Sequence, residues 1–301
     1  MNCIRWTVLL MLLAIIGCSS TPSESDPAAL SVARLGKSST NRIFEGTKLA
    51  VLDDLQIQQE NGRSFVQVDD MRFAIEAKEI VVKRVGGSGD SRSLVSNPWP
   101  WGRFVYHFSP EVRANSAWVA QFVSACELLT SSSGIHCIDR AKQKHPSKIV
   151  DYAYIIRGNG NYSYVGQVGG RQELSVVSWG NRQIIAHEIK HALGWTHEHQ
   201  RPDRDSFVRV NHGNFDTANR HNFTKMGRKD GTAYDFESIM HYSSTAFSNN
   251  GQRTIDPLGQ YQNQLAVMGQ RSYISQTDTN NGSDSFMQLR RRSHVTHQDK
   301  G

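Results

Sequence analysis

The sequence predicts an α+β fold, in which long helices pack on a sheet. Apolar side chains recur at helical spacing through residues 116–130, which indicates a long helix lying against a sheet. A second helix is expected over residues 182–193, where apolar residues again recur at core-facing spacing. Three short apolar runs have the character of strands: 150–157, 162–166 and 174–178.

Length and composition are typical of one folded domain with an accessory segment. The chain has 301 residues, and Lys and Arg exceed Asp and Glu by six (34 minus 28). This modest excess is spread along the chain, with no basic helix and no basic patch interleaved with aromatic residues. We therefore expect no nucleic-acid partner. The composition carries no signal of an oligomeric state.

Residues 1–17 have the pattern of a targeting signal. Arg5 gives a positive start, and the apolar run after it is too short to span a membrane. The run ends in Gly17-Cys18, which resembles a bacterial lipobox, where the cysteine becomes the lipidated first residue. Ser19 resembles the signal for passage to an outer membrane. A lipid on Cys18 would anchor the protein to that membrane without spanning it; the alternative is an ordinary signal peptide cleaved elsewhere, giving an extracellular protein.

Residues 18–95 are expected to form a tether and a propeptide-like region. The first part is rich in Ser, Thr, Pro and acidic residues, which have little to bury. Alternating runs over 64–68 and 71–75 predict strands or a small hairpin, with a turn signal at Asn61-Gly62. A Gly- and Ser-rich stretch over 84–92 predicts a flexible boundary before the main domain.

The stretch with the clearest chemistry is His187-Glu188-Ile-Lys-His191-Ala-Leu-Gly194-Trp-Thr-His197. On a helix, residues four apart lie one above the other, so His187 and His191 aim their imidazoles at one point. Gly194 can take a left-handed conformation, which ends the helix and turns the chain back. That turn allows His197 to supply a third nitrogen to the same metal.

Three neutral imidazoles with one open position are typical of a catalytic zinc site, because structural zinc sites are closed by four protein ligands. We therefore expect Zn²⁺ as the cofactor and His187, His191 and His197 as its ligands. Glu188 follows the first ligand but points elsewhere on the helix, where it can take a proton from water that the metal activates. The pattern predicts metal-assisted hydrolysis with Glu188 as general base.

Two longer motifs resemble those of one known family. The run His197-Glu-His-Gln-Arg-Pro-Asp-Arg-Asp205 is similar to the zinc motif of the astacin branch of the metzincin zinc endopeptidases, and Tyr234-Asp-Phe-Glu-Ser-Ile-Met240-His-Tyr242 is similar to its second motif. The resemblance implies a two-lobed catalytic domain over residues 96–290. Its upper lobe would hold a mixed twisted sheet with long helices, and its lower lobe would be irregular with a C-terminal helix. Residues 291–301 are expected to be a disordered basic tail.

The resemblance also implies roles for single residues. Met240 would form a tight turn beneath the zinc. Tyr242 would be a mobile zinc ligand that swings out to stabilise the tetrahedral intermediate, which a hydroxyl can do by ligation or by donating a hydrogen bond. Glu198 would support the mature N-terminus through a buried ion pair. The expected catalytic residues are Glu188 and Tyr242, acting on a polypeptide substrate.

The same resemblance raises the question of latency. Relatives carry a propeptide with an F-E-G-D motif whose aspartate occupies the zinc. This sequence has Phe44-Glu45-Gly46-Thr47, and a Thr hydroxyl is a poor substitute for a carboxylate ligand. Glu45, Asp53 or Asp54 could take that place, or the region could be a folding aid that does not inhibit and is never removed.

The four cysteines fall into two pairs: Cys3 and Cys18 in the targeting segment, and Cys126 and Cys137 in the domain. The partners of the family's two usual bridges are missing from this sequence. A Cys126–Cys137 bond would close a short loop and add about 2–3 kcal/mol of stability. A free, buried Cys126 on the helix is the alternative.

Together these observations predict a zinc-dependent endopeptidase that acts on proteins outside the cytoplasm. Two alternatives stay open. One is a zinc-bearing binding homologue without turnover, although the intact Glu188 argues against it. The other is an amidase acting on peptidoglycan peptides, which would need the same metal, base and oxyanion donor.

Overall fold

The computed structural model describes residues 33–34, 42–43, 50–51, 55–76, 79–80, 99–133, 135–226 and 233–279, all of them within one compact unit that spans residues 31–301. The targeting segment with Cys18, the motif at 44–47, Asp53, Asp54 and the tail over 291–301 lie outside the described residues. Predictions that concern them stay predictions. In the described part of the chain, no helix is long and apolar enough to cross a membrane.

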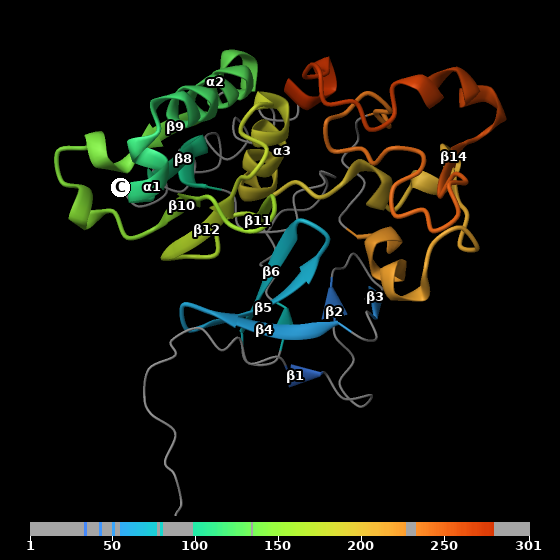
Figure 1. The fold of residues 1–301 in the computed structure, drawn as a ribbon, viewed down its shortest axis with the longest axis horizontal. Helices are drawn as coiled ribbons and strands as arrows, with labels where there is room; N and C mark the ends of the chain where they lie inside the picture. The colour runs from blue at the N-terminus through green and yellow to red at the C-terminus, as the bar shows by residue number, and fades with distance from the viewer. Residues whose placement is uncertain are drawn as a thin grey trace, which may run out of the picture. The chain divides into compact units, whose positions relative to one another are not determined.

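We call residues 99–279 the catalytic part, because they include the motifs for which catalysis is predicted. This part is built on a mixed sheet (Figure 1). Its parallel strands are β8 (Arg103–Phe108), β9 (His136–Asp139), β10 (Tyr152–Ile156) and β12 (Arg171–Ser175). The strand β11 (Tyr162–Tyr164) runs antiparallel to β12, and the order is β11-β12-β10-β8-β9. The strands predicted over 150–157 and 162–166 are confirmed, whereas the third begins at Arg171 and not at residue 174.

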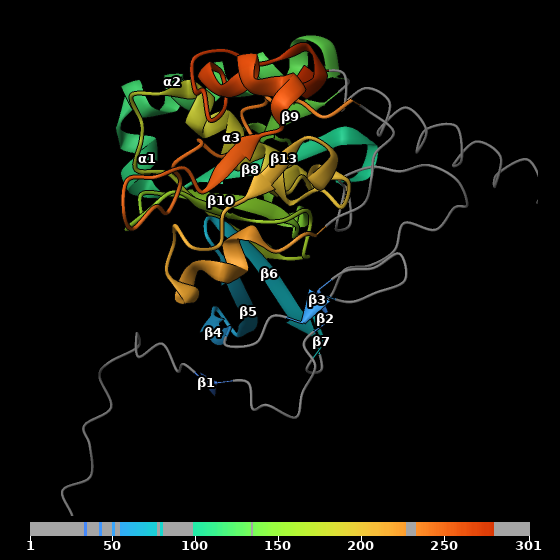
Figure 2. The same ribbon diagram turned by 90° about the vertical axis from the view of Figure 1, so that its right-hand side faces the viewer.

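Two long helices pack against this sheet and against each other (Figure 2). They are α2 (Ser116–Ser133), which follows the short α1 (Pro110–Ala114), and α3 (Arg182–Leu193). Their apolar faces share one core with β8, β10 and β12, in which Phe122 of α2 and Ile185 and Ile189 of α3 are fully buried. Both predicted helices are confirmed. The mixed sheet with helices agrees with the predicted α+β class.

Ahead of the catalytic part, an antiparallel N-terminal sheet is formed by β4 (Gln56–Glu60), β5 (Arg63–Val68) and β6 (Met71–Glu76). Asn61 and Gly62 both have positive φ, 50° and 74°, as a tight two-residue hairpin turn requires. The predicted hairpin is therefore confirmed. The strand β6 pairs in parallel with β11, so the N-terminal sheet continues the catalytic sheet. Short outer strands pair as follows: β1 (Ala33–Arg34) with β4, β7 (Glu79–Ile80) with β6, and β2 (Arg42–Ile43) with β3 (Ala50–Val51).

The C-terminal part is irregular, as the resemblance implied. Its only paired strands among the described residues are β13 (Val208–Val210) and β14 (Ile255–Pro257), which are antiparallel. A second apolar core, including Phe223, Tyr234 and Tyr242, stabilises it. Residues 276–279 are helical, and residue 279 is the last that the structure describes. Short 3₁₀ helices lie at Pro100–Gly102, Arg140–Lys142, Pro146–Lys148, Glu198–Gln200, Arg204–Ser206, Thr217–Phe223 and Gly259–Ala266.

A disulfide joins Cys126 of α2 to Cys137 of β9, with the Cα atoms 6.1 Å apart. Of the two alternatives drawn from the sequence, the bonded one is therefore correct. The bond ties the helix to the edge strand of the catalytic sheet.

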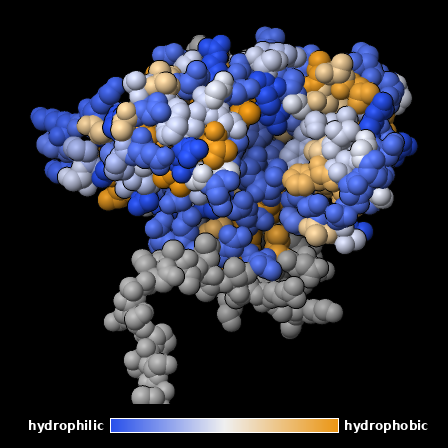
Figure 3. Space-filling model, viewed as in Figure 1, coloured by the Kyte–Doolittle hydropathy of each residue, from blue (hydrophilic) through white to orange (hydrophobic). Residues whose placement is uncertain are grey.

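Most of the surface seen in Figure 3 is hydrophilic, and its apolar side chains stand in separate patches. Within the described residues, the large exposed hydrophobic side chains are Val150, Val177 and Tyr273. Single exposed apolar residues of this kind are ordinary on a folded protein.

Candidate zinc site

The helix α3, which carries the first two histidines, is fixed at both ends. At its start the side-chain oxygen of Asn181 accepts the N–H groups of Gln183 and Ile184 at 2.9 and 3.1 Å. At its end Gly194 has φ 114°, and its N–H donates to the carbonyl of His191 at 2.8 Å. A side chain would be strained at that φ, so glycine suits the position. The left-handed turn predicted at Gly194 is confirmed.

The three histidines converge as their spacing predicted. The Nε2 atoms of His187 and His191 are 3.0 Å apart, and His197 belongs to the same cluster of potential ligand atoms, all within 4.8 Å of one another. Nδ1 of His187 donates to the carbonyl of Ile239, and Nδ1 of His191 to that of Trp195, each at 2.6 Å. Because Nδ1 carries the hydrogen, Nε2 presents its lone pair to the centre of the cluster.

The cluster fits a metal ion on chemical grounds. Lone pairs held this close repel one another unless a cation lies between them, and zinc bonds of about 2.0–2.1 Å would place tetrahedral ligand atoms about 3.3 Å apart. The buried Nε2 of His197 makes no hydrogen bond with the described residues, although a carboxylate oxygen of Asp70 lies 3.1 Å from it. Burial, with a smaller effect of His191, lowers the pKa of His187 to about 3, and burial also lowers the pKa of His191. Both rings are therefore neutral at pH 7, as metal ligands must be.

A fourth potential ligand, Asp70, was missed by the sequence analysis. Its carboxylate lies 3.0 Å from Nε2 of His187, 3.2 Å from Nε2 of His191 and 3.1 Å from Nε2 of His197. Asp70 thus occupies the fourth position that the histidines leave open.

Asp69 and Asp70 form the turn between β5 and β6, so the N-terminal sheet delivers both carboxylates together. Asp69 has φ 54°, a conformation that Asp tolerates better than most residues. Its carboxylate accepts the hydroxyl of Tyr242 at 2.5 Å. One two-residue turn therefore engages the three histidines and the predicted oxyanion donor at once.

Strand pairing holds this turn in place. The N–H of Ser163 donates to the carbonyl of Asp70 at 2.8 Å, and that of Val165 to Arg72 at 3.0 Å. The guanidinium of Arg72 lies 3.5 Å from the ring centre of Tyr162 on β11 and makes an ion pair of 2.7 Å with Glu60 on β4. The outer edge of β11 is therefore occupied by the chain's own β6.

Glu188, which follows His187 on α3, is buried. It is 1% exposed, and its Oε2 has no hydrogen-bond partner among the described residues. Burial, then the negative charges of Asp70 and Asp69, raise the pKa of Glu188 well above its usual value. A carboxyl group that faces two others is driven toward its protonated form.

The remaining predicted site residues lie around the cluster. Met240 is buried in the main core, and its carbonyl accepts the N–H of Glu198 at 2.9 Å. Glu198 accepts from Arg201 at 3.0 Å and from the N–H of Asp235 at 3.0 Å. The Tyr242 ring packs on His197, with ring centres 4.6 Å apart. Cys18 lies outside the described residues, so nothing in the structure bears on its lipidation.

A signal for Asp70 was present in the sequence but was not used. The strands on either side of Asp69-Asp70 were predicted, and two adjacent acidic residues at a hairpin tip are conspicuous. The family resemblance pointed instead to residues 44–47, where it implies an F-E-G-D aspartate. Nothing local in the sequence shows that this tip reaches a histidine 117 residues away.

A helix with two histidines one turn apart, a third after a glycine turn and a buried glutamate beside them define the metallohydrolase class of site. Comparison with known proteins places the chain within that class. The model of Astacin, a peptidase family, matches residues 92–286, and the chain belongs to this family. The predicted resemblance to astacins is thereby confirmed.

Individual relatives agree with the assignment. Zinc metalloproteinase nas-14 of Caenorhabditis elegans is 44% identical over 137 residues, covering 43% of this chain and 26% of that protein. High choriolytic enzyme 2 of Oryzias latipes is 42% identical over 132 residues, covering 42% of this chain and 46% of that protein. A solved structure of High choriolytic enzyme 1, a hatching enzyme zinc-protease from the same fish, also matches, with 32% identity and a TM-score of 0.55. The match covers 65% of this chain and 90% of the chain in that structure. The chain matches about a quarter to a half of the length of these curated relatives.

Proposed function

We propose that the chain is a zinc-dependent endopeptidase that hydrolyses peptide bonds in proteins. The observation that carries the proposal is the convergence of three imidazoles next to a buried glutamate. Family membership and the zinc-protease relatives support the same reaction. The ligands would be His187, His191 and His197, as expected from their spacing.

The chain's own residues supply the rest of the reaction. When bound, zinc polarises the substrate carbonyl and lowers the pKa of the attacking water. Glu188 takes the proton from that water and passes it to the leaving amine. The Tyr242 hydroxyl donates to the negative charge that develops on the carbonyl oxygen. The outer edge of β11 would pair with the substrate backbone by strand addition.

We further propose that the N-terminal sheet keeps the enzyme latent. Asp70 fills the open ligand position, Asp69 engages Tyr242, and β6 covers the edge of β11. All three features needed for turnover are blocked by one element, so the active form requires that this sheet leave the site. Asp70 would thus do what the F-E-G-D aspartate does in relatives, from a different place in the sequence.

The location of the enzyme rests on residues 1–19 alone. We propose that the protein is exported and that a lipid on Cys18 anchors it to a bacterial outer membrane. The Gly17-Cys18-Ser19 pattern supports this assignment. The Cys18→Ala variant is expected to move from the membrane fraction to the soluble fraction after export, and an unchanged membrane fraction would speak against the anchor.

The experiment that tests the reaction is cleavage of an unfolded reporter protein by a chain that begins at Asn97. The main core of residues 99–240 and the second core of residues 208–268 need no residue of the N-terminal sheet, so this chain keeps both. We expect zinc-dependent cleavage that falls by about 10²-fold or more in Glu188→Ala and after chelation. Full activity in Glu188→Ala would overturn the mechanism. No cleavage by a chain that binds zinc would favour a binding protein or an amidase of peptidoglycan peptides.

A further inference from the structure

A buried ion pair lies next to the histidine cluster but is not part of it. Lys190 of α3 and Asp278 near the C-terminus have side chains 3% and 2% exposed, and Lys190 Nζ is 2.5 Å from Asp278 Oδ1. Taking two charges out of water is unfavourable unless other groups also bond to them. The other contacts of Asp278 supply such groups, and they lead to the metal site.

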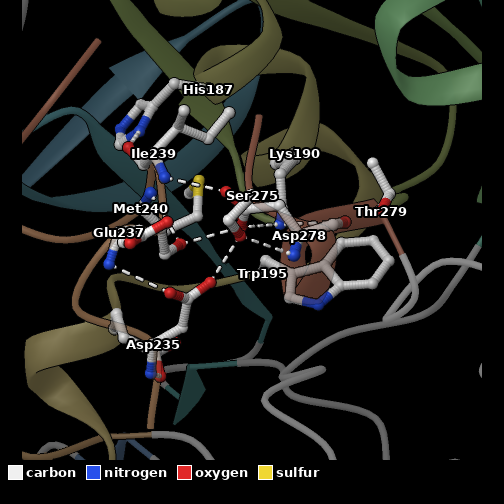
Figure 4. Close-up of polar contacts among 12 residues, drawn as sticks. His187, Lys190, Trp195, Asp235, Glu237, Ile239, Met240, Ser275, Asp278 and Thr279 are labelled. Atoms are coloured by element: carbon white, nitrogen blue, oxygen red, sulfur yellow. Dashed lines mark hydrogen bonds and ion pairs between the residues drawn. The ribbon is translucent and has the colours of Figure 1, made fainter. Parts of the chain in front are cut away.

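Both oxygens of Asp278 hold the turn that contains Met240 (Figure 4). Oδ1 accepts the hydroxyl of Ser238 at 2.8 Å, and Oδ2 accepts the N–H of Ile239 at 2.8 Å. Burial alone would raise the pKa of Asp278, but Lys190 and the bonds from Ile239 and Ser238 hold it below its usual range. An ionised carboxylate makes stronger hydrogen bonds than a neutral group, so the turn is firmly fixed.

The turn that Asp278 holds also orients His187, the first histidine. Ile239 gives its N–H to Asp278 and receives the Nδ1 hydrogen of His187 on its carbonyl, at 2.6 Å. Lys190 and His187 lie one helical turn apart on α3. The contacts thus form a closed ring that leaves α3 at Lys190, passes through Asp278 and Ile239, and returns to α3 at His187.

A second branch runs toward the third histidine. The N–H of Asp278 donates to the hydroxyl of Ser275 at 3.0 Å, and that hydroxyl donates to Asp235 at 2.5 Å. The N–H of Asp235 donates to Glu198 at 3.0 Å, and Glu198 directly follows His197. Asp278 therefore contributes to joining the segments that carry His187 and His197, beside the direct bond from the Glu198 N–H to the Met240 carbonyl.

We propose that Lys190 and Asp278 are positioning residues, which hold His187 in the tautomer and orientation that binds the metal. The inference rests on the proposed zinc site but not on turnover. Asp278 acts through the Ile239 peptide, and Lys190 supplies the positive charge that keeps Asp278 an acceptor on both oxygens. Loss of the pair should therefore loosen the metal, not merely weaken the fold.

The test uses the full chain loaded with zinc and three variants. Lys190→Met removes the ammonium charge and leaves an apolar side chain of similar length. Asp278→Asn keeps the shape of the side chain but loses its charge. The double variant Lys190→Met/Asp278→Asn buries no unpaired charge, so its metal-free form should unfold at a higher temperature than either single variant. It still lacks the ionised acceptor for Ser238 and Ile239. Stability and metal retention are thereby separated.

Two readouts report on the metal. We expect the zinc transfer rate to a chromogenic chelator to rise about 10- to 100-fold in Asp278→Asn and in the double variant, as for other partners of metal-binding histidines. The visible spectrum of the cobalt-loaded chain should change in the same variants. Asp139→Asn is the matched control: it removes a carboxylate that pairs with Arg113 at 2.9 Å, far along the sequence from the network. It should lower the unfolding temperature and leave zinc release unchanged.

Wild-type release and an unchanged cobalt spectrum in the double variant would overturn the inference, and so would equal acceleration by Asp139→Asn. Should Asp278→Asn fail to fold, the double variant decides alone. Because release needs no substrate, a chain that binds zinc without cleaving protein would refute the proposed reaction while leaving this test intact. A wild-type chain that binds no zinc would overturn both.

Discussion

Three carboxylates lie at the histidine cluster, and their charge states differ because their neighbours differ. Burial and the two aspartates raise the pKa of Glu188 well above its usual value. Burial with the nearby Asp70 raises the pKa of Asp69 to about 6. In this closed form both aspartates lie close enough to Glu188 to raise its pKa. Removal of the turn would therefore open the fourth ligand position and take both carboxylates away from Glu188.

Tyr242→Phe tests the oxyanion role at the residue scale. The substitution removes the hydroxyl that donates to Asp69 in the closed form and, we propose, to the oxyanion in turnover. In the chain beginning at Asn97, kcat should fall by about 10²-fold with little change in KM. Tyr234→Phe is the control, because its buried hydroxyl contacts His241 at 2.8 Å and not the cluster. Equal losses in the two variants would argue against the assignment.

Asp139 gives a pH-dependent test of stability away from the metal. Burial alone would raise its pKa, but two hydrogen bonds from Arg113, at 2.9 and 3.0 Å, and one from Ala141 lower it. A folded-state pKa below the unfolded value of 3.8 means that the carboxylate stabilises the fold above that pH. The stabilisation is lost as the pH falls through the folded-state pKa.

Asp139→Asn should therefore lower the free energy of unfolding by roughly 1 kcal/mol at pH 7, since Arg113 is partly exposed. The difference from wild type should shrink as the pH falls below 3.8, measured by urea unfolding at pH 7 and at a series of lower pH values. A difference that stays constant across that series is the contrary result.

At the scale of elements, the N-terminal sheet binds the catalytic sheet through the backbone hydrogen bonds between β6 and β11 and through the side chain of Arg72. That side chain lies over the rings of Tyr162 and Phe65, at 3.5 and 4.5 Å, and pairs with Glu60. Its contacts span β4, β5, β6 and β11. Arg72 is therefore the side chain whose loss should most directly weaken docking of the sheet.

Arg72→Ala is expected to raise the proteolytic rate of the full chain. Loss of the cation–π contacts and ion pair should weaken docking by roughly 1–2 kcal/mol, which raises the open fraction about 5- to 30-fold. Arg157→Ala is the control, since its guanidinium lies 5.7 Å from the Trp118 ring within the catalytic part. If Arg72→Ala leaves the full chain as slow as wild type, the docking account is wrong.

The contrast between predicted and missed features has a physical origin at this scale. The helix α3, its end at Gly194 and the hairpin turn at Asn61-Gly62 depend on local spacing and local φ, so the sequence predicted them. Asp70 depends on a parallel pairing between β6 and β11, strands more than eighty residues apart in the chain. Neither strand encodes its partner locally. The Lys190–Asp278 pair was missed for the same reason, because its members meet only in the tertiary structure.

At the scale of the whole molecule, the N-terminal and catalytic strands form one continuous sheet. An apolar cluster seals the junction, with Val66, Val68 and Met71 of the N-terminal sheet against Val165 and Met226 of the catalytic part. Release therefore requires that ladder bonds and apolar contacts break together. We therefore expect the site to open in one cooperative step, because a partial opening would break some of these contacts without freeing the site.

The most direct test compares the cleavage rates of three zinc-loaded proteins: the full chain, its Asp69→Asn/Asp70→Asn variant, and the chain beginning at Asn97. We predict that the full chain is slower than the shortened chain by at least about 10²-fold, as for a site open in about one molecule in a hundred. The double variant should lie between them, because it keeps the strand pairing but loses both carboxylates. A full chain that cleaves the reporter as fast as the shortened one would contradict the account.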